Sequence, residues 1–151
     1  MLTALLPPER IRVPLGSHSR HALLRELVDL ALPDADVATA ETVFQSVLAR
    51  EALARTAMGD GLAVPHGRTD AVTGLHMAAG LVGAMDDYSA PDGKPVRAVF
   101  LLITPPSDGG AHLKVLARLA RLMRRDELRL ALFAATDAAA FAAVLQRASA
   151  P

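Results

Sequence analysis

The sequence contains no cysteine and no tryptophan, and aromatic residues make up only 3% of it. Without cysteine, neither a disulfide framework nor a metal site built on thiolates is possible. No apolar run approaches the roughly 18 consecutive residues that a membrane-spanning helix needs. We interpret the scarcity of aromatic residues, beside abundant alanine and arginine, as a matter of genome composition rather than mechanism.

A surplus of charge of either sign is also missing, because 16 basic residues are balanced by 16 acidic ones. Nucleic acids and anionic membranes attract proteins with a basic surplus, so we expect neither nucleic acid nor direct membrane insertion. The first residues lack the basic start and apolar stretch of a signal peptide. A cytoplasmic location is therefore expected.

Apolar side chains are plentiful, at 52% of 151 residues. This length and this supply of core residues suit a single domain over residues 1–151. Charged residues make up 21% of the chain, which argues against disorder. No internal repeat and no long linker divides the sequence.

Apolar residues recur at helical spacing in several segments. A first helix is predicted after an N-cap at Ser17 and ends at Pro33, and a second runs from Asp36 or Thr39 to about Ala54. Another helix follows a turn at 105–110. The last two helices have candidate caps at Asp126 and at Thr136 or Asp137. The predicted buried face of the first helix consists of Leu23, Leu27, Leu30 and Ala31. For the helix after residue 110, the predicted buried face consists of Leu113, Leu116, Ala117 and Ala120.

Short apolar runs between these helices predict strands at 11–15, 62–64, 75–82 and 98–103. The run 98–103 is apolar on both faces, as expected of a central buried strand. Residues 58–61 and 88–95 are predicted as a glycine-bearing connection and a loop. Helices and strands do not alternate strictly. We therefore predict an α/β sandwich, with a central mixed sheet flanked by helices on both faces.

One histidine follows a strand-like run directly, in the sequence Leu62-Ala63-Val64-Pro65-His66-Gly67. Pro65 fixes its own φ angle, and Gly67 allows a turn and the close approach of another molecule. A neutral imidazole can act as a nucleophile through one nitrogen when the other donates its proton to a fixed acceptor. His66 is therefore a candidate nucleophile for phosphoryl transfer.

The segment from Glu51 to Gly67 resembles the phosphorylation-site signature of the fructose/mannitol-type (type 2) enzyme IIA family of the bacterial phosphotransferase system. The matching positions are Glu51, Met58-Gly59 and the run 62–67. Three further blocks are similar to the family, namely Leu5 to Ile11, Asp92 to Val96, and His112 to Ala117. The first of these blocks and the run Pro65-His66-Gly67-Arg68 look most like the nitrogen-regulatory branch of the family.

The resemblance implies that His66 accepts a phosphoryl group through Nε2. It also implies that Arg50 is the active-site arginine, whose planar guanidinium suits phosphoryl oxygens. His112 matches a second family histidine close to the first, although it could simply be a polar residue at a helix start. Thr56 either adds a hydroxyl near the phosphoryl group or is a local turn or cap residue, and Gly67 is a phosphate neighbour.

The implied activity is that of a phosphotransferase, a phosphohistidine phosphocarrier without a cofactor. The donor would be the histidine phosphocarrier protein HPr or its nitrogen-branch counterpart, and the target a IIB domain or a regulated kinase or transporter. We favour a nitrogen-regulatory role. The alternatives are a sugar-specific IIA component that passes phosphate to a separate IIB, and a regulatory binding module that works independently of phosphorylation.

The remaining polar clusters favour simpler interpretations. His18 and His21 are three residues apart and could touch a metal, but no further ligands occur at matching spacing, so no metal site is predicted. A basic stripe on the helix after residue 110 is interpreted as a solvated face rather than a docking surface. Its members are Lys114, Arg118, Arg121 and Arg125.

Overall fold

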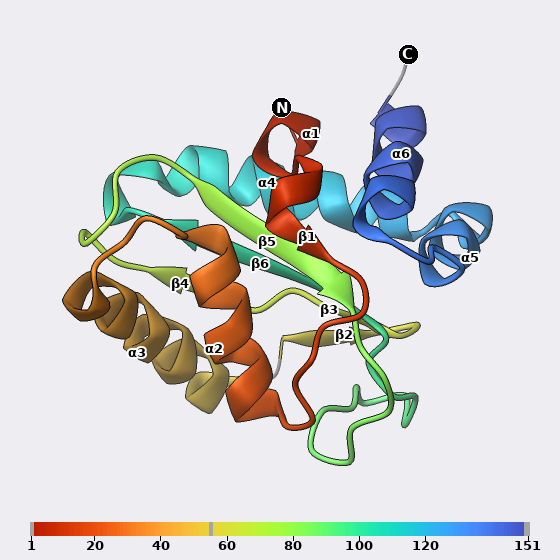
Figure 1. Cartoon of the computed structure of the whole chain (residues 1–151), viewed down its shortest axis with the longest axis horizontal. Helices are drawn as coiled ribbons and strands as arrows, with labels where there is room; N and C mark the ends of the chain where they lie inside the picture. Colours follow the sequence, from red (N-terminus) through yellow and green to blue (C-terminus); the bar gives the residue numbers. More distant parts are fainter. Residues whose placement is uncertain (1, 55, 150–151) are drawn as a thin grey trace.

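The computed structural model describes residues 2–54 and 56–149, which build a mixed sheet between two layers of helices (Figure 1). The sheet order is β1-β5-β6-β3-β2, and β4 also pairs with β6. β5 is antiparallel to β6, whereas β3 and β4 are parallel to it. The strands are β1 (Ile11–Arg12), β2 (Ala57–Gly59), β3 (Leu62–Ala63), β4 (His66–Arg68), β5 (His76–Leu81) and β6 (Ala98–Thr104).

Central strand β6 is buried along its whole length and contributes to two separate cores, because its side chains alternate between the faces of the sheet. Val99, Leu101 and Ile103 pack with α2 (Arg20–Ala31) and α3 (Val37–Leu53). Phe100 and Leu102 pack on the other side. The helices of that side are α1 (Leu2–Leu5), α4 (Gly109–Met123), α5 (Asp126–Phe133) and α6 (Ala138–Ser149). The predicted α/β sandwich is confirmed.

Side-chain caps define the starts of several helices. Asp36 accepts a hydrogen bond from the Thr39 amide at 2.7 Å at the start of α3, as predicted. Asp137 does the same for Ala140 at the start of α6. Two predicted caps are wrong: Ser19, not Ser17, caps α2, and Asp126 is the first residue of α5. Its carboxylate still lies at the positive end of that helix dipole.

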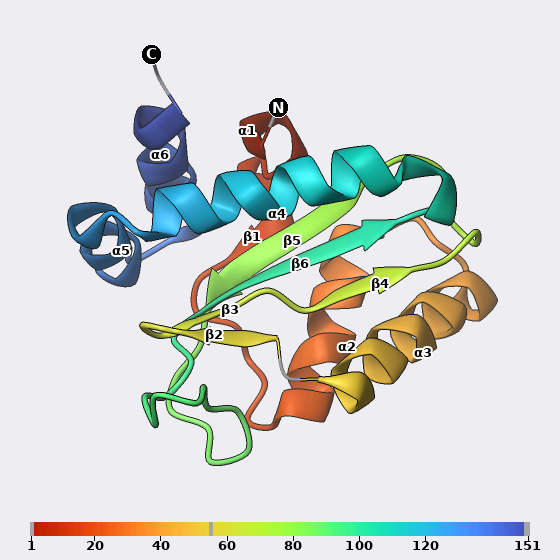
Figure 2. The same ribbon diagram turned by 180° about the vertical axis from the view of Figure 1, so that it is seen from behind.

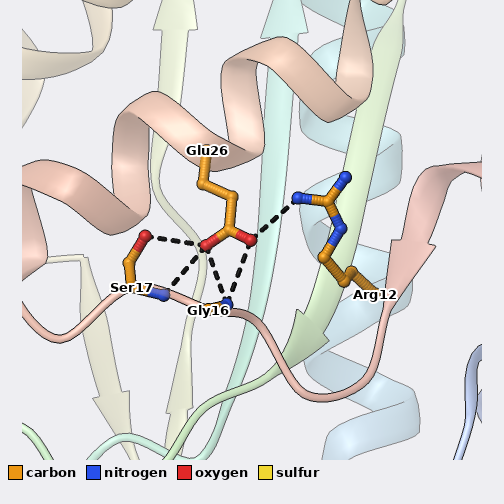
Figure 3. Close-up of polar contacts among 4 residues, drawn as sticks. All are labelled: Arg12, Gly16, Ser17 and Glu26. Carbon is orange, nitrogen blue, oxygen red and sulfur yellow. Dashed lines mark hydrogen bonds and ion pairs between the residues drawn. The ribbon is translucent and has the colours of Figure 1, made fainter.

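Ser17 has a different task, which is to bind the carboxylate of Glu26 on α2 (Figure 3). Glu26 accepts hydrogen bonds from the Ser17 hydroxyl at 2.7 Å, from the backbone amides of Gly16 and Ser17, and from the Arg12 guanidinium at 2.8 Å. The carboxylate of Glu26 therefore holds the connection between β1 and α2 against that helix. Sequence periodicity carried no sign of this contact.

The region before His66 contains more strand than predicted. Met58 and Gly59 belong to β2, which forms an antiparallel pair with β3 around a turn at Asp60 and Gly61. Asp60 has a φ of 55° and Gly61 a φ of 82°, so this tight turn uses the left-handed backbone region. His66 does not leave the sheet after Pro65; it begins β4.

The predicted buried face of α4 is mostly wrong, since of its members only Leu116 packs, half-buried, against the core. Leu113 is 67% exposed and Ala117 is exposed, whereas the buried residues are His112, Val115, Leu119, Leu122 and Met123. Two apolar stripes run along this helix, and periodicity could not decide between them. The stripe that includes His112 packs against β6, so the other is left beside His66. Of the basic stripe, Lys114, Arg121 and Arg125 are exposed, as expected of a solvated face.

Within the described ranges, none of the helices combines the length and the apolar character needed to cross a bilayer. Those same ranges contain no group of three or more potential metal-ligating side chains.

Candidate phosphoryl-transfer site

Strand β4 places His66 at the edge of the sheet, between α3 and α4 (Figure 2). It pairs in parallel with the end of β6, so that His66 lies opposite Leu102. Gly67 faces α3, where an added Cβ would overlap the Ser46 hydroxyl and lie 3.1 Å from a Val47 methyl carbon. The glycine thus allows α3 to pack closely on β4. Because strand side chains alternate, His66 and Arg68 share the opposite face.

Both ring nitrogens of His66 have a partner. Nδ1 lies 2.9 Å from the Val64 carbonyl oxygen, which can only accept, so Nδ1 carries the proton. Nε2 then has a lone pair, and it accepts a hydrogen bond from Nε of Arg50 at 3.1 Å. Arg50 comes from α3, sixteen positions earlier in the chain, and also donates to the Ala54 carbonyl at 3.0 Å. The lone pair of His66 therefore lies on Nε2, where the Arg50 guanidinium donates a hydrogen bond to it.

His112 from α4 completes the group on the other side of His66. The two rings meet edge to face, with centroids 5.2 Å apart. His112 is only 4% exposed, and its Nδ1 lies 2.8 Å from the Thr104 hydroxyl oxygen. Burial is the main cause that lowers the pKa of His112 to about 4, and nearby charge acts in the same direction. His112 is therefore neutral near pH 7. The positive charges concerned are those of Arg68 and Arg50.

These residues line one cavity of about 460 Å³ that opens to solvent. Its lining includes Arg50, His66, Arg68 and His112. Leu53 and Leu113 stand on it with 84% and 67% of their surface exposed. The site therefore combines two imidazole groups, two guanidinium groups and an apolar surround. Such an arrangement can bind a phosphoryl group and accept a protein surface around it.

Thr56 lies elsewhere. It is buried, its hydroxyl donates a short hydrogen bond to Glu51, and it lies 3.3 Å from the Tyr88 hydroxyl. Burial, reinforced by the negative charge of Glu51, raises the pKa of Tyr88 well above its usual range. The second carboxylate oxygen of Glu51 has no hydrogen-bond partner among the described residues. Thr56 thus joins the end of α3 to the 88–95 loop and does not line the cavity of His66.

The structure brings Arg50, His66, Gly67 and His112 together, as the sequence predicted for the site, and adds Arg68 and Thr104. Arg68 could have been found from its position two residues after His66, since such residues share a strand face. Its guanidinium donates to the Pro106 carbonyl at 3.3 Å. Thr104 had no sequence signal, because its contact with His112 depends on how α4 packs.

The family described as "Phosphoenolpyruvate-dependent sugar phosphotransferase system, EIIA 2" matches residues 4–148. The chain belongs to this enzyme IIA family. Domains of this family accept and transfer phosphoryl groups.

Relatives of this enzyme IIA domain carry both nitrogen-regulatory and sugar-transport names. A nitrogen regulatory protein of Bradyrhizobium diazoefficiens is 39% identical over 147 residues, which cover 95% of this chain and 94% of that protein. A fructose-specific EIIA component of Haloferax volcanii is 28% identical over 128 residues, covering 85% of this chain and 83% of that protein.

Solved structures give the same picture of the fold. Nitrogen regulatory protein IIA-Ntr from Neisseria meningitidis superposes with a TM-score of 0.84 at 31% identity, over 95% of this chain and 98% of that one. Enzyme IIA for mannitol from Escherichia coli, in its complex with phosphorylated enzyme IIB, has a TM-score of 0.75 at 18% identity. That alignment covers 92% of this chain and 95% of the other.

Proposed function

We propose that this chain is a phosphocarrier that accepts a phosphoryl group on Nε2 of His66, from a phosphohistidine of HPr or of its nitrogen-branch counterpart. One observation carries the proposal: the Val64 carbonyl holds the proton of His66 on Nδ1, and Arg50 meets the lone pair on Nε2. A histidine oriented in this way keeps one nitrogen bound to the backbone and offers the lone pair of the other for nucleophilic attack.

The hydrogen bond from Arg50 blocks the lone pair at rest, so it must break before attack. We infer that the arriving phosphoryl group draws the guanidinium away, because its oxygens carry more negative charge than an imidazole nitrogen. A bond then forms between Nε2 of His66 and phosphorus, while the bond from phosphorus to the donor nitrogen breaks. The electron pair of that bond stays on the donor imidazole. Arg50 stabilises the phosphoryl oxygens during the transfer.

Protein partners would dock on the apolar surround of the cavity. Exposed Leu53 and Leu113 offer apolar contacts on two sides of His66, and Arg68 adds a cationic group on the same side of β4. A phosphoryl group adds roughly −1.5 to −2 charges near pH 7 at the centre of this surface. Partner affinity should therefore differ between the phosphorylated and the free protein.

We favour a nitrogen-regulatory role, because relatives at 39% and 31% identity bear nitrogen-regulatory names. The second candidate is a sugar-specific IIA that passes its phosphoryl group to a separate IIB. It is favoured by the fructose-specific relative and by the fold shared with the mannitol IIA that was solved with phosphorylated IIB. A binding module that acts without phosphorylation is the third.

The first experiment is intact-protein mass spectrometry after incubation with phosphoenolpyruvate, enzyme I and HPr from one host. We expect one added phosphoryl group, labile in acid, that is absent from His66→Ala and present in His18→Ala, where an exposed histidine outside the site is removed. Normal phosphorylation of His66→Ala would refute the proposal. Failure of the wild-type protein, with an active donor, would leave the binding module.

Arg50→Ala should slow phosphorylation by about a hundredfold, the usual loss when one donor to a developing charge is removed. The unchanged fold of the variant is checked by circular dichroism. A rate within twofold of wild type would show that Arg50 binds His66 in the free protein but does not stabilise the phosphoryl group during transfer. To separate the two roles, the phosphorylated protein is offered to a fructose-type IIB. Transfer to IIB, with rescue of sugar uptake in a strain that lacks its own IIA, would favour the sugar role.

A further inference from the structure

Thr104 occupies the last position of β6, directly behind the candidate site. Its side chain is fully buried, with 0% exposure, and faces α4, as do those of Phe100 and Leu102 earlier in the strand. Its hydroxyl oxygen lies 2.8 Å from Nδ1 of His112. This is the one hydrogen bond of the Thr104 hydroxyl within residues 2–54 and 56–149.

The position of the proton in this hydrogen bond follows from counting donors and acceptors. If Nδ1 of His112 donated, the hydroxyl hydrogen of Thr104 would be buried without an acceptor among the described residues. Leaving a buried donor unpaired costs free energy, because it loses the hydrogen bond that water would have provided. If the hydroxyl donates instead, its hydrogen and the Nδ1 lone pair are both satisfied. The second arrangement therefore has the lower free energy.

We propose that Thr104 is a positioning residue, whose hydroxyl donates to Nδ1 of His112 and so keeps the proton of that imidazole on Nε2. Nε2 makes no hydrogen bond within the described part of the chain, and the surrounding protein does not enclose it completely. It therefore reaches the cavity that His112 lines. The second nitrogen of His112 is a hydrogen-bond donor directed toward the space beside His66.

The two histidines consequently hold opposite tautomers. His66 has its proton on Nδ1, held by a backbone carbonyl, and its lone pair on Nε2. His112 has its lone pair on Nδ1, held by Thr104, and its proton on Nε2. One presents a nucleophile and the other a donor, across ring centroids 5.2 Å apart. With the reverse tautomer, His112 would present a lone pair to a phosphoryl oxygen and repel it.

This inference rests on the proposed function for its consequence, but not for its test. A neutral His112 that keeps its Nε2 proton donates to the phosphoryl oxygens before, during and after transfer, with no change of charge. Arg50 supplies the positive charge from α3, and His112 supplies a neutral donor from α4. Thr104 acts only through His112 and does not itself touch the phosphoryl group.

The test compares Thr104→Val, which keeps the shape of the side chain but removes the hydroxyl, with Thr104→Ser, which keeps the hydroxyl. Long-range ¹H–¹⁵N NMR spectra of the imidazole groups distinguish a protonated ring nitrogen from one with a lone pair. His112→Asn assigns the His112 signals. The spectra are recorded on the unphosphorylated protein near pH 7.

We expect Nε2 of His112 to be the protonated nitrogen in the wild type and in Thr104→Ser. In Thr104→Val, the Nδ1 signal should move toward the protonated position as the tautomers mix. A wild-type spectrum with the proton on Nδ1 would overturn the inference, whatever the protein's activity. So would a Thr104→Val spectrum identical to that of the wild type.

Phosphorylation kinetics then test the consequence. Thr104→Val should be phosphorylated about 10–100 times more slowly, the loss seen when the outer partner that fixes a histidine nitrogen is removed from a metal site. Thr104→Ser should recover most of the rate. If Thr104→Val shifts the tautomer of His112 but leaves the phosphorylation rate unchanged, His112 does not act as a hydrogen-bond donor to the phosphoryl oxygens. No phosphorylation of the wild type would instead refute the proposed function and leave the NMR result standing.

Discussion

The carboxylate of Glu26 offers the clearest quantitative test of how the fold is held together (Figure 3). Glu26→Gln keeps the size of the side chain but replaces one acceptor oxygen by a donor group. The best placement of the amide keeps its oxygen toward Ser17 and turns its NH₂ group toward Arg12. Arg12 is half exposed and can turn to water. The variant therefore loses the ion pair and weakens the hydrogen bonds from the backbone amides of Gly16 and Ser17.

The cost can be estimated from these contacts. A partly exposed ion pair contributes up to about 1 kcal/mol. Each backbone hydrogen bond falls from roughly 1.5–3 kcal/mol, with a charged acceptor, to roughly 0.5–1.5 kcal/mol with a neutral one. Two weakened backbone hydrogen bonds and the lost ion pair together reduce the free energy of unfolding by about 2–4 kcal/mol. At about 2–4 °C per kcal/mol for a chain of this size, the melting temperature should fall by about 4–16 °C.

The loss should also depend on pH. Burial acts to raise the pKa of Glu26, but hydrogen bonds from the Gly16 amide, Arg12 and Ser17 outweigh it and hold the pKa below its ordinary value. A lowered pKa stabilises the fold above the unfolded-state value of about 4.3, and the stabilisation disappears as the pH falls through the lower pKa of the folded state. The difference in stability between wild type and Glu26→Gln should therefore shrink as the pH falls below about 4.3, and should vanish below the lowered pKa of the folded state.

The assay is urea unfolding followed by circular dichroism at pH 7 and pH 3.5. Glu127→Gln, which changes a carboxylate that is 79% exposed, is the control and should cost less than about 0.5 kcal/mol. A Glu26→Gln variant within about 0.5 kcal/mol of the wild type at pH 7 would refute the reasoning. A difference of the same size at both pH values would show that the charge of Glu26 is not the cause.

Two further predictions concern packing and capping. Gly67→Ala should cost about 1–3 kcal/mol, because the new methyl group meets Ser46 and Val47, and it should slow phosphorylation by displacing β4. Gly83→Ala, where an added Cβ meets nothing within 4 Å, is the control; equal melting temperatures of the two variants would contradict the expected clash. Asp137→Ala should cost about 1 kcal/mol in chemical denaturation by removing the 2.7 Å cap on Ala140, and an unchanged midpoint would show that α6 does not depend on this cap.

Much of the site could be predicted from the sequence, because its first elements are local. Pro65, His66 and Gly67 are consecutive, and the apolar run before them places His66 directly after a strand. Asp36 and Asp137 act on amides three residues away, so their capping can be read from sequence. The apolar run 98–103 was enough to predict the central strand, since a strand buried on both faces needs apolar residues at every position.

Tertiary structure decided whatever depended on two separate segments meeting. Helix α4 has two apolar stripes, and its packing against β6 buried His112 and left Leu113 exposed beside His66. Ser17 looks like a helix cap until Glu26 is seen to bind it. The contact of Thr104 with His112 joins a strand end to a helix start, and no local pattern specifies it. Sequence alone was enough to recognise the family and to select His66 as the candidate nucleophile, because the signature lies within the short segment from Glu51 to Gly67. Packing decided the hydrogen-bond partners of His66 and His112 and left Leu113 exposed beside them, because those features depend on neighbours distant in the chain.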